Sequence, residues 1–253
     1  MASTQSTASQ QDNPLANIVL NVLAPVLILN YCSKEGEKFY QLGPYVAMGV
    51  AIAIPVLYGV WHFIAKRGFN VFSAVGFFNV LLTGIITIYL YSSDDPEVRR
   101  RAPLLFGLKE AIQPLILGSL FLLTHRTKTP LFNVFIYNDA VFDQKRIGKA
   151  IEEKGTVAEH DSLLWQSTKL FFGSFLLSAV LNLGLAYYFL GDLDPGLENW
   201  KELYNQDVAR ITGWGFLVIG LPLVIIGAVI LFRLVTGLKT LTDLPTEQIM
   251  NAR

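Results

Sequence analysis

Six long apolar runs constrain the fold of this 253-residue chain more than any other feature. In a helix, about 20 apolar residues cross the roughly 30 Å hydrocarbon core of a bilayer. A helix also satisfies its own backbone donors and acceptors, as lipid requires. We therefore expect an all-α, polytopic transmembrane bundle of six helices. The expected spans are about 15–31, 42–65, 71–91, 104–123, 163–190 and 211–235.

Composition supports this class and excludes several others. Hydrophobic residues make up 52% of the chain and charged residues only 16%, which is typical of a membrane protein rather than a soluble domain. The formal net charge is zero, so a nucleic-acid partner is not expected. The single cysteine, Cys32, excludes an internal disulfide and a thiolate metal set.

The sequence contains no recognisable catalytic motif. Its three histidines, His62, His125 and His160, have no metal-ligand spacing, and there is no glycine-rich phosphate loop or nucleophile elbow. We therefore expect a protein that is not an enzyme and that holds neither a metal nor a cofactor.

Charge distribution predicts how the chain is organised around the membrane. Residues 1–13 are polar but lack Lys and Arg, so a disordered tail is expected rather than a secretory signal. Residues 14–245 should form one transmembrane domain, followed by a tail at 246–253. The loop 124–162 holds six Lys or Arg residues, which places it and both termini in the cytoplasm. Arg99–Arg101 argue for the opposite orientation.

Two of the connections carry patterns of their own. In the loop 124–162, the apolar stretch 130–137 is too short to span and would lie at the membrane interface or pack under the bundle. Residues 143–154 predict a short helix ended by Gly155, either solvated or with a basic face toward anionic lipid. In the fifth loop, Trp200 and Tyr204 suggest an amphipathic helix at the outer interface.

The span 104–123 is the anomalous one, because it carries Lys109, Glu110 and Gln113 inside its first turns. Charges inside a membrane are costly and usually face protein or water. Pro114 also lacks the N–H that would bond the carbonyl of Glu110. Charge, amide and a free carbonyl therefore gather at one depth, which makes this cluster the candidate intramembrane polar site.

Two interpretations of this cluster remain open. In the first, Lys109 extends its amine to the nearby surface and Glu110 pairs with a cation such as Arg99–Arg101 or Arg210. In the second, polar residues of neighbouring helices close a cavity around the pair. Those residues are Asn21, Asn79, Thr83 and Asn182.

Small residues repeat along two other spans and predict helix packing. Ser174, Ser178 and Asn182 lie on one stripe of the fifth span, and Gly213, Gly220 and Gly227 repeat along the sixth. Such residues let helix backbones approach closely in membranes. Prolines and later arginines are also similarly spaced in the second, fourth and sixth spans, which would fit three helical hairpins. Chance would explain that spacing equally well.

Several segments, taken in order, resemble one bacterial membrane family. They are NPLANIVLNVLAP at 13–25, Leu81–Gly84, Lys109–Ala111, Pro130–Leu131 and TKLFFGSFLLSAVLNLGLAY at 168–187. The chain is similar over about 13–244 to the inner-membrane family grouped with septation protein A. The longer fourth loop and acidic fifth loop depart from the shorter members.

The resemblance implies an inner-membrane protein tied to cell-envelope synthesis, septation or membrane lipid maintenance. It supplies no active-site residue for this chain. We expect a scaffold or accessory subunit whose partners are the lipid bilayer and other membrane proteins or further copies of itself. The alternative is a small transporter or lipid-handling protein that uses the cluster around Lys109 and Glu110.

Overall fold

The computed structural model describes residues 19–66 and 71–251, and the predicted polar tail 1–13 and the predicted start of the first span lie outside them. Over the described residues the fold is all-α, as predicted. No strand forms among them, apart from two isolated bridges that pair Glu35 with Leu42 and Phe142 with Met250.

The chain divides into two compact units. Unit 1 comprises residues 1–102 and 192–213, and unit 2 comprises residues 103–191 and 214–253. In unit 1, α2 packs against α3 and α3 against α4. The elements of unit 1 are a π-helical turn at Val19–Leu23, α2 at Ala24–Cys32, α3 at Pro44–Lys66, α4 at Val71–Tyr91, α5 at Pro96–Arg99 and most of α10, Trp200–Gly215.

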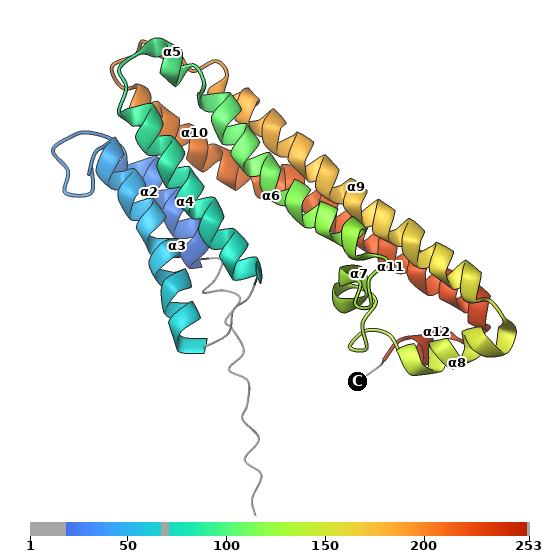
Figure 1. Ribbon diagram of the computed structural model, residues 1–253. Helices are drawn as coiled ribbons and strands as arrows, with labels where there is room; N and C mark the ends of the chain where they lie inside the picture. The colour runs from blue at the N-terminus through green and yellow to red at the C-terminus, as the bar shows by residue number, and fades with distance from the viewer. Residues whose placement is uncertain (1–18, 67–70, 252–253) are drawn as a thin grey trace, which may run out of the picture. The chain divides into compact units, whose positions relative to one another are not determined.

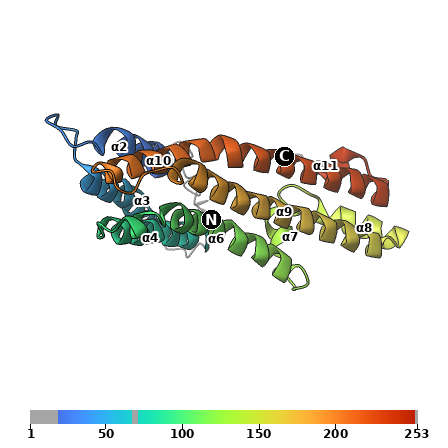
Figure 2. The same cartoon turned by 90° about the horizontal axis from the view of Figure 1, so that it is seen from above.

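Unit 2 is built on three long helices that run side by side, α6, α9 and α11 (Figures 1 and 2). Three short helices, α7, α8 and α12, gather at one end of them. The elements are α6 at Ala102–Thr124, α7 at Leu131–Phe135, α8 at Gln144–Lys154, α9 at Val157–Leu190, a π-helical turn at Phe216–Gly220, α11 at Leu221–Thr242 and α12 at Thr246–Ile249.

Local sequence explains where the short helices begin and end. Asp95 caps α5, with its side chain accepting a hydrogen bond from the N–H of Glu97 at 2.9 Å. Asp143 caps α8 in the same way, accepting from the N–H of Arg146 at 3.0 Å. Gly155 ends α8 with a φ of 70°, a left-handed conformation that glycine adopts at little cost. The predicted helix at 143–154 is therefore confirmed.

Four helical stretches are long and apolar enough to cross a membrane: Pro44–Trp61, Pro96–Thr124, Val157–Leu190 and Trp200–Thr242. The prediction of six spans is not confirmed, because the first and third expected spans do not meet this criterion over the part of the chain that the structure describes. Large apolar side chains on these helices are exposed, including Leu57 on α3 and Phe232 on α11. Apolar faces of this kind need lipid or protein to cover them.

The core of unit 2 draws on the loop between α6 and α9. Phe132 of α7 and Ile147 of α8 are fully buried together with Leu234 and Leu238 of α11. In the apolar stretch 130–137, Phe132 and Tyr137 are thus buried in this core, whereas Val134 and Phe135 are exposed. Helix α8 is not a fully solvated helix, because Ile147 and Ile151 are buried in this core.

The C-terminal residues belong to the same core. Ile249 of α12 is fully buried, and its carbonyl accepts a hydrogen bond from the N–H of Asp143 at 2.9 Å. The N–H of Asn251 bonds the carbonyl of Val141 at 3.0 Å. The expected tail 246–253 is therefore packed, as far as residue 251, against the segment that leads into α8.

Candidate functional site

Lys109 and Glu110 form an ion pair within α6. The side chain of Lys109 is only 4% exposed, and that of Glu110 is 24% exposed. The Lys109 ammonium also lies 4.7 Å from the centre of the Phe106 ring, where the negative face of the ring attracts it. The two neighbouring charges thus neutralise each other in a poorly solvated place.

Two of the cations that the sequence offered to Glu110 lie in unit 1 and have partners there. Arg99 pairs with Asp94 at 2.7 Å, and Arg210 pairs with Asp207 at 2.8 Å. Lys109 does not extend to solvent, since its side chain is buried. Within unit 2, Glu110 is paired with Lys109 of the same helix. A pairing of Glu110 with Arg99–Arg101 or Arg210, which belong to unit 1, stays a prediction.

The remaining polar residues of the predicted cluster divide between the two units. Asn182 and Gln113 lie in unit 2, and the Asn182 amide donates to the carbonyl of Ser178 at 2.9 Å on its own helix. Asn79 and Thr83 lie in unit 1, where the Thr83 hydroxyl donates to the carbonyl of Asn79 at 2.9 Å. Asn21 lies in the π-helical turn at Val19–Leu23. Two of these residues thus use a hydrogen bond inside their own helix.

The predicted packing residues behave in two ways. Ser174 and Ser178 of α9 are buried, and the Ser174 hydroxyl donates to the carbonyl of Phe171 at 2.6 Å. A Cβ atom added at Gly213 or Gly227 would meet no atom within 4 Å, and one at Gly220 would meet only the carbonyl of Gly215, at 3.9 Å. These glycines therefore make no close helix contact among the described residues.

Sequence analysis missed the glycines at which helices do approach closely. A Cβ atom added at Gly118 of α6 would lie 2.7 Å from the Cβ of Phe175 on α9. One added at Gly107 would lie 3.1 Å from the Cβ of Ala186. The two positions stand eleven residues apart, near three helical turns, so they share a face of α6. The spacing of eleven residues between the two glycines was the sequence signal that could have predicted this packing face.

A buried hydrogen-bonded centre in unit 1 was also missed. The amide nitrogen of Asn205 donates to the Ser33 hydroxyl and to the Pro44 carbonyl, each at 2.9 Å, and its amide oxygen accepts from the Tyr91 hydroxyl at 2.5 Å. One side chain thereby joins α10 to α3, to α4 and to Ser33, the residue that directly follows α2. A lone asparagine in a polar helix carries no sequence signal for this role.

The helix suggested by Trp200 and Tyr204 forms as α10, but these two side chains do not face its surroundings, and the position of the helix at an outer interface stays a prediction. Both are almost fully buried, and their rings stack 5.2 Å apart at an angle of 20°. The Tyr91 ring meets the Tyr204 ring edge-on at 5.9 Å. One turn of spacing correctly placed the two side chains on one face, but that face packs inside unit 1.

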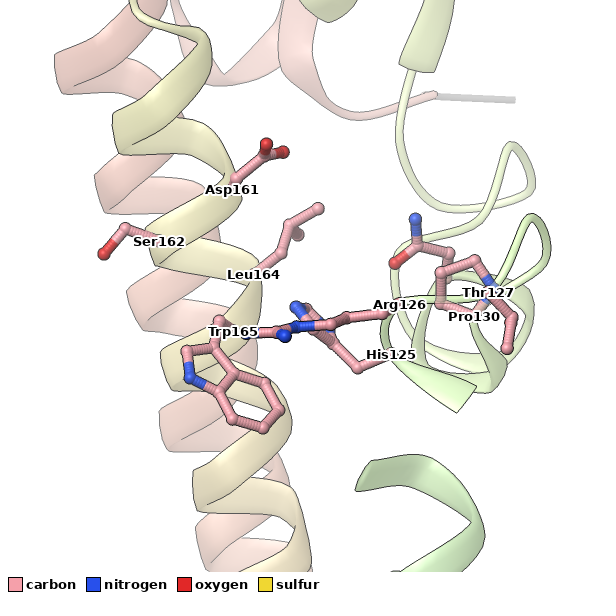
Figure 3. Close-up of a pocket in the computed structure, with 9 residues that line it drawn as sticks. His125, Arg126, Thr127, Pro130, Asp161, Ser162, Leu164 and Trp165 are labelled. Atoms are coloured by element: carbon pink, nitrogen blue, oxygen red, sulfur yellow. The ribbon is translucent and has the colours of Figure 1, made fainter. Parts of the chain in front are cut away.

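A pocket of about 620 Å³ lies in unit 2 where α6 ends and α9 begins (Figure 3). Figure 3 shows Asp161 and Leu164 projecting from α9 toward the segment that carries His125 and Arg126, whereas Ser162 points to the other side. Sequence analysis did not predict this pocket. Its lining residues are His125, Arg126, Thr127, Pro130, Asn133, Asp161, Ser162, Leu164 and Trp165.

His125 is fixed at the wall of this pocket by contacts with α9. Its ring lies 4.5 Å from the Trp165 ring, and its Nδ1 lies 3.4 Å from the Thr168 hydroxyl oxygen. Burial and the neighbouring Arg126 lower the pKa of His125 below its usual value, and Asp161 partly opposes them. The imidazole is therefore neutral near pH 7.

Among the described residues, no three His, Cys, Asp or Glu side chains gather in a way that could hold a metal ion. Comparisons with protein-family models, with curated proteins and with solved structures found no match to the chain.

Proposed function

We propose that this chain is a multi-pass protein of the bacterial inner membrane with six spans and with both termini and the loop 124–162 in the cytoplasm. Four helices of sufficient length and apolar character support the membrane location. The excess of Lys and Arg in the loop 124–162 supports the orientation. The first and third spans of the proposal correspond to the π-helical turn with α2, and to α4.

Within that membrane, the proposed role is non-enzymatic: a scaffold or accessory subunit in envelope, septation or membrane maintenance. The observation that carries this proposal is the ion pair between Lys109 and Glu110. A transport site keeps its charges available to a substrate, whereas Lys109 is buried and paired with the partly buried Glu110. The resemblance to the septation protein A family supplies the link to the envelope.

The surface for a membrane partner would lie on α11. Val224 is 69% exposed and Phe232 is 72% exposed, and the small, exposed Ala228 lies one turn from each of them on the same face. Small residues beside large apolar ones are what membrane helices use to pack against each other. A second copy of the chain or another membrane protein would fit this face.

A photo-crosslinking residue at Phe232 tests the scaffold role in living cells. We expect a discrete protein adduct from Phe232, and a weaker one when Ala228 is replaced by Leu, because the larger side chain obstructs the same face. A matched probe at Leu57 on α3 reports contacts of a different exposed face. Adducts with lipid alone at Phe232 would contradict the scaffold role.

A second candidate function is lipid handling or transport, which the pocket beside His125 favours. The double variant K109M/E110Q separates the two functions in a strain that lacks the chromosomal copy. A scaffold should restore envelope integrity with both charges removed, while a transporter using this pair should not. Deleting 130–154 would not serve as a test, because Phe132 and Ile147 belong to the core of unit 2.

A further inference from the structure

The pocket at the end of α6 has the size and the walls of a binding site. Its volume of about 620 Å³ falls within the roughly 300–1,000 Å³ of small-molecule sites. Leu164, Pro130 and Trp165 form apolar walls, while Arg126 and Asp161 bring opposite charges to the same space. What these groups would recognise can be argued from their hydrogen-bonding capacity.

Arg126 supplies the positive end. It is exposed, lines the pocket and makes no hydrogen bond or ion pair within the described part of the chain. A guanidinium group matches the oxygen geometry of a phosphate and donates to it with two parallel N–H groups. The Asn133 amide lines the same pocket and adds an uncharged donor. The Thr127 hydroxyl also lines it, but this hydroxyl donates to the carbonyl of Thr124 at 2.7 Å and can only accept from a ligand.

Asp161 supplies the negative end. Its side chain is 74% exposed, and the charged or chargeable group nearest to it is His160, at 3.9 Å. No ion pair joins Asp161 to Arg126 among the described residues, so each charge remains available to a ligand. The two formal charges sum to zero, which disfavours a purely anionic ligand and a purely cationic one.

His125 adds a hydrogen-bond acceptor beside Asp161. The Thr168 hydroxyl donates its proton to the Leu164 carbonyl at 2.8 Å, so it can only accept from His125 Nδ1. The hydrogen bonds therefore assign the proton of the neutral imidazole to Nδ1 and leave Nε2 as an acceptor. An acceptor next to a carboxylate favours an ammonium group.

The pocket lies at the level where two apolar helices of unit 2 become polar. Helix α6 ends at Thr124, directly before His125, and the apolar part of α9 begins at about Leu163. The Trp165 ring also has the Lys169 ammonium 5.5 Å from its centre. Tryptophan and lysine are enriched where a membrane helix meets the headgroup layer.

We propose that this pocket binds the zwitterionic headgroup of a phospholipid, with Arg126 donating to the phosphate and Asp161 and His125 accepting from the ammonium group. This inference rests on the proposed membrane location and not on the scaffold role. The chemistry recognised is a phosphate joined to a primary ammonium, as in phosphatidylethanolamine. A soluble molecule such as free phosphoethanolamine carries the same groups.

Native mass spectrometry of the purified full chain in a non-ionic detergent tests the proposal. The probes are phosphatidylethanolamine and phosphatidylglycerol with identical acyl chains, each added at the same concentration. The test variants are R126Q and D161N. The matched controls are K128Q and E152Q, which change exposed charges of unit 2 that do not line the pocket.

The expected result is one retained phosphatidylethanolamine, preferred over phosphatidylglycerol. Loss of a charge-assisted hydrogen bond should lower its retention about tenfold in R126Q and in D161N, with no change in the controls. Retention in R126K should recover partly, because a lysine keeps the charge but loses the paired donors. Unchanged circular dichroism of R126Q and D161N shows that the fold is intact.

Two outcomes would overturn the inference. If D161N binds more phosphatidylglycerol and R126Q less, with phosphatidylglycerol preferred by the wild type, the pocket is an anion site. If R126Q and D161N match K128Q and E152Q, the pocket is not the binding site. Equal occupancy by free phosphoethanolamine would keep the chemistry and overturn the lipid as its source.

A failure of the headgroup site can be distinguished from a failure of the proposed membrane location. Extraction of the chain from membranes by alkaline carbonate would contradict the membrane location, whatever the pocket binds. A membrane-embedded chain whose R126Q variant retains phosphatidylethanolamine normally would contradict only the headgroup site.

Discussion

At the scale of single residues, the ion pair in α6 places two formal charges in a poorly solvated part of unit 2. Lys109 is nearly inaccessible, and Glu110 lies beside it with a quarter of its side chain exposed. Removing one partner of a buried pair leaves the other charge poorly solvated, whereas removing both replaces the pair by neutral groups. The pair should therefore behave as one unit.

A double-mutant cycle measures that behaviour. We expect E110Q to be less stable than the wild type, and the double variant K109M/E110Q to recover much of the loss. The coupling energy should be about 1–3 kcal/mol, because the two groups are in direct contact. Thermal unfolding in detergent gives the four stabilities, and additive losses would show that the charges act independently.

His125 predicts a pH dependence at the same scale. Its pKa is lowered in the folded chain, so the unfolded chain binds a proton more readily. The contribution of His125 to the free energy of unfolding is fully present above the unfolded pKa of about 6.5. It is lost as the pH falls toward the pKa of the folded state. The wild type should thus lose stability relative to H125Q between pH 7 and pH 5.

The size of that loss should be below about 1 kcal/mol, since the imidazole remains partly in contact with solvent. Melting curves of the wild type and H125Q across this pH range check it, because other titrating groups affect both proteins alike. The lowered pKa would be contradicted if the difference in melting temperature between the wild type and H125Q did not change with pH. It would also be contradicted if the wild type became the more stable of the two in acid.

At the scale of elements, close helix contacts in unit 2 depend on glycines of α6. Gly118 faces Phe175 at a distance that leaves no room for a methyl group, while Gly184 of α9 has no atom within 4 Å of its added Cβ. We expect G118A to be less stable by about 1–3 kcal/mol, as in other overpacked positions. G184A should gain up to about 1 kcal/mol from helix propensity.

Thermal unfolding of the two alanine variants gives a matched comparison, since both make the same chemical change in a helix of the same unit. Equal stabilities of G118A and G184A would show that α6 and α9 do not approach each other at Gly118.

Among the elements, those marked by local chemistry could be predicted from the sequence. The helix at 143–154 was predictable because Asp143 and Gly155 mark its ends by local chemistry. The burial of Ile147 was not, because the partner surface on α11 lies about 90 residues away in sequence. Trp200 and Tyr204 show the same limit: their shared face was evident from spacing, but aromatic residues suit both a membrane interface and a protein core.

In the candidate site, too, contacts within one helix could be predicted from the sequence, and contacts between distant segments could not. The contact between Lys109 and Glu110 is local, and their presence in one helix turn indicated it. The pocket beside His125 combines the end of α6 with the start of α9, and the 130–137 segment completes its wall. No periodicity within one segment could indicate that combination.

At the scale of the whole molecule, the number of helices that cross the membrane decides on which side the N-terminal loops lie. With six spans and cytoplasmic termini, residues 33–43 lie outside. If only α3, α6, α9 and α11 cross, with the same C-terminal side, residues 33–43 lie in the cytoplasm. The positions of the 124–162 loop and of the fifth loop are the same in both arrangements, so they serve as internal references.

Cysteine accessibility in intact cells decides between these arrangements most directly. In a C32A background, single cysteines replace Glu37, Glu152 and Asp194, three exposed residues. A topology of six spans with cytoplasmic termini predicts that an impermeant maleimide labels the cysteines at 37 and 194 in intact cells, and the cysteine at 152 only after permeabilisation. Labelling at 152 from outside, or protection at 37 in intact cells, would contradict it.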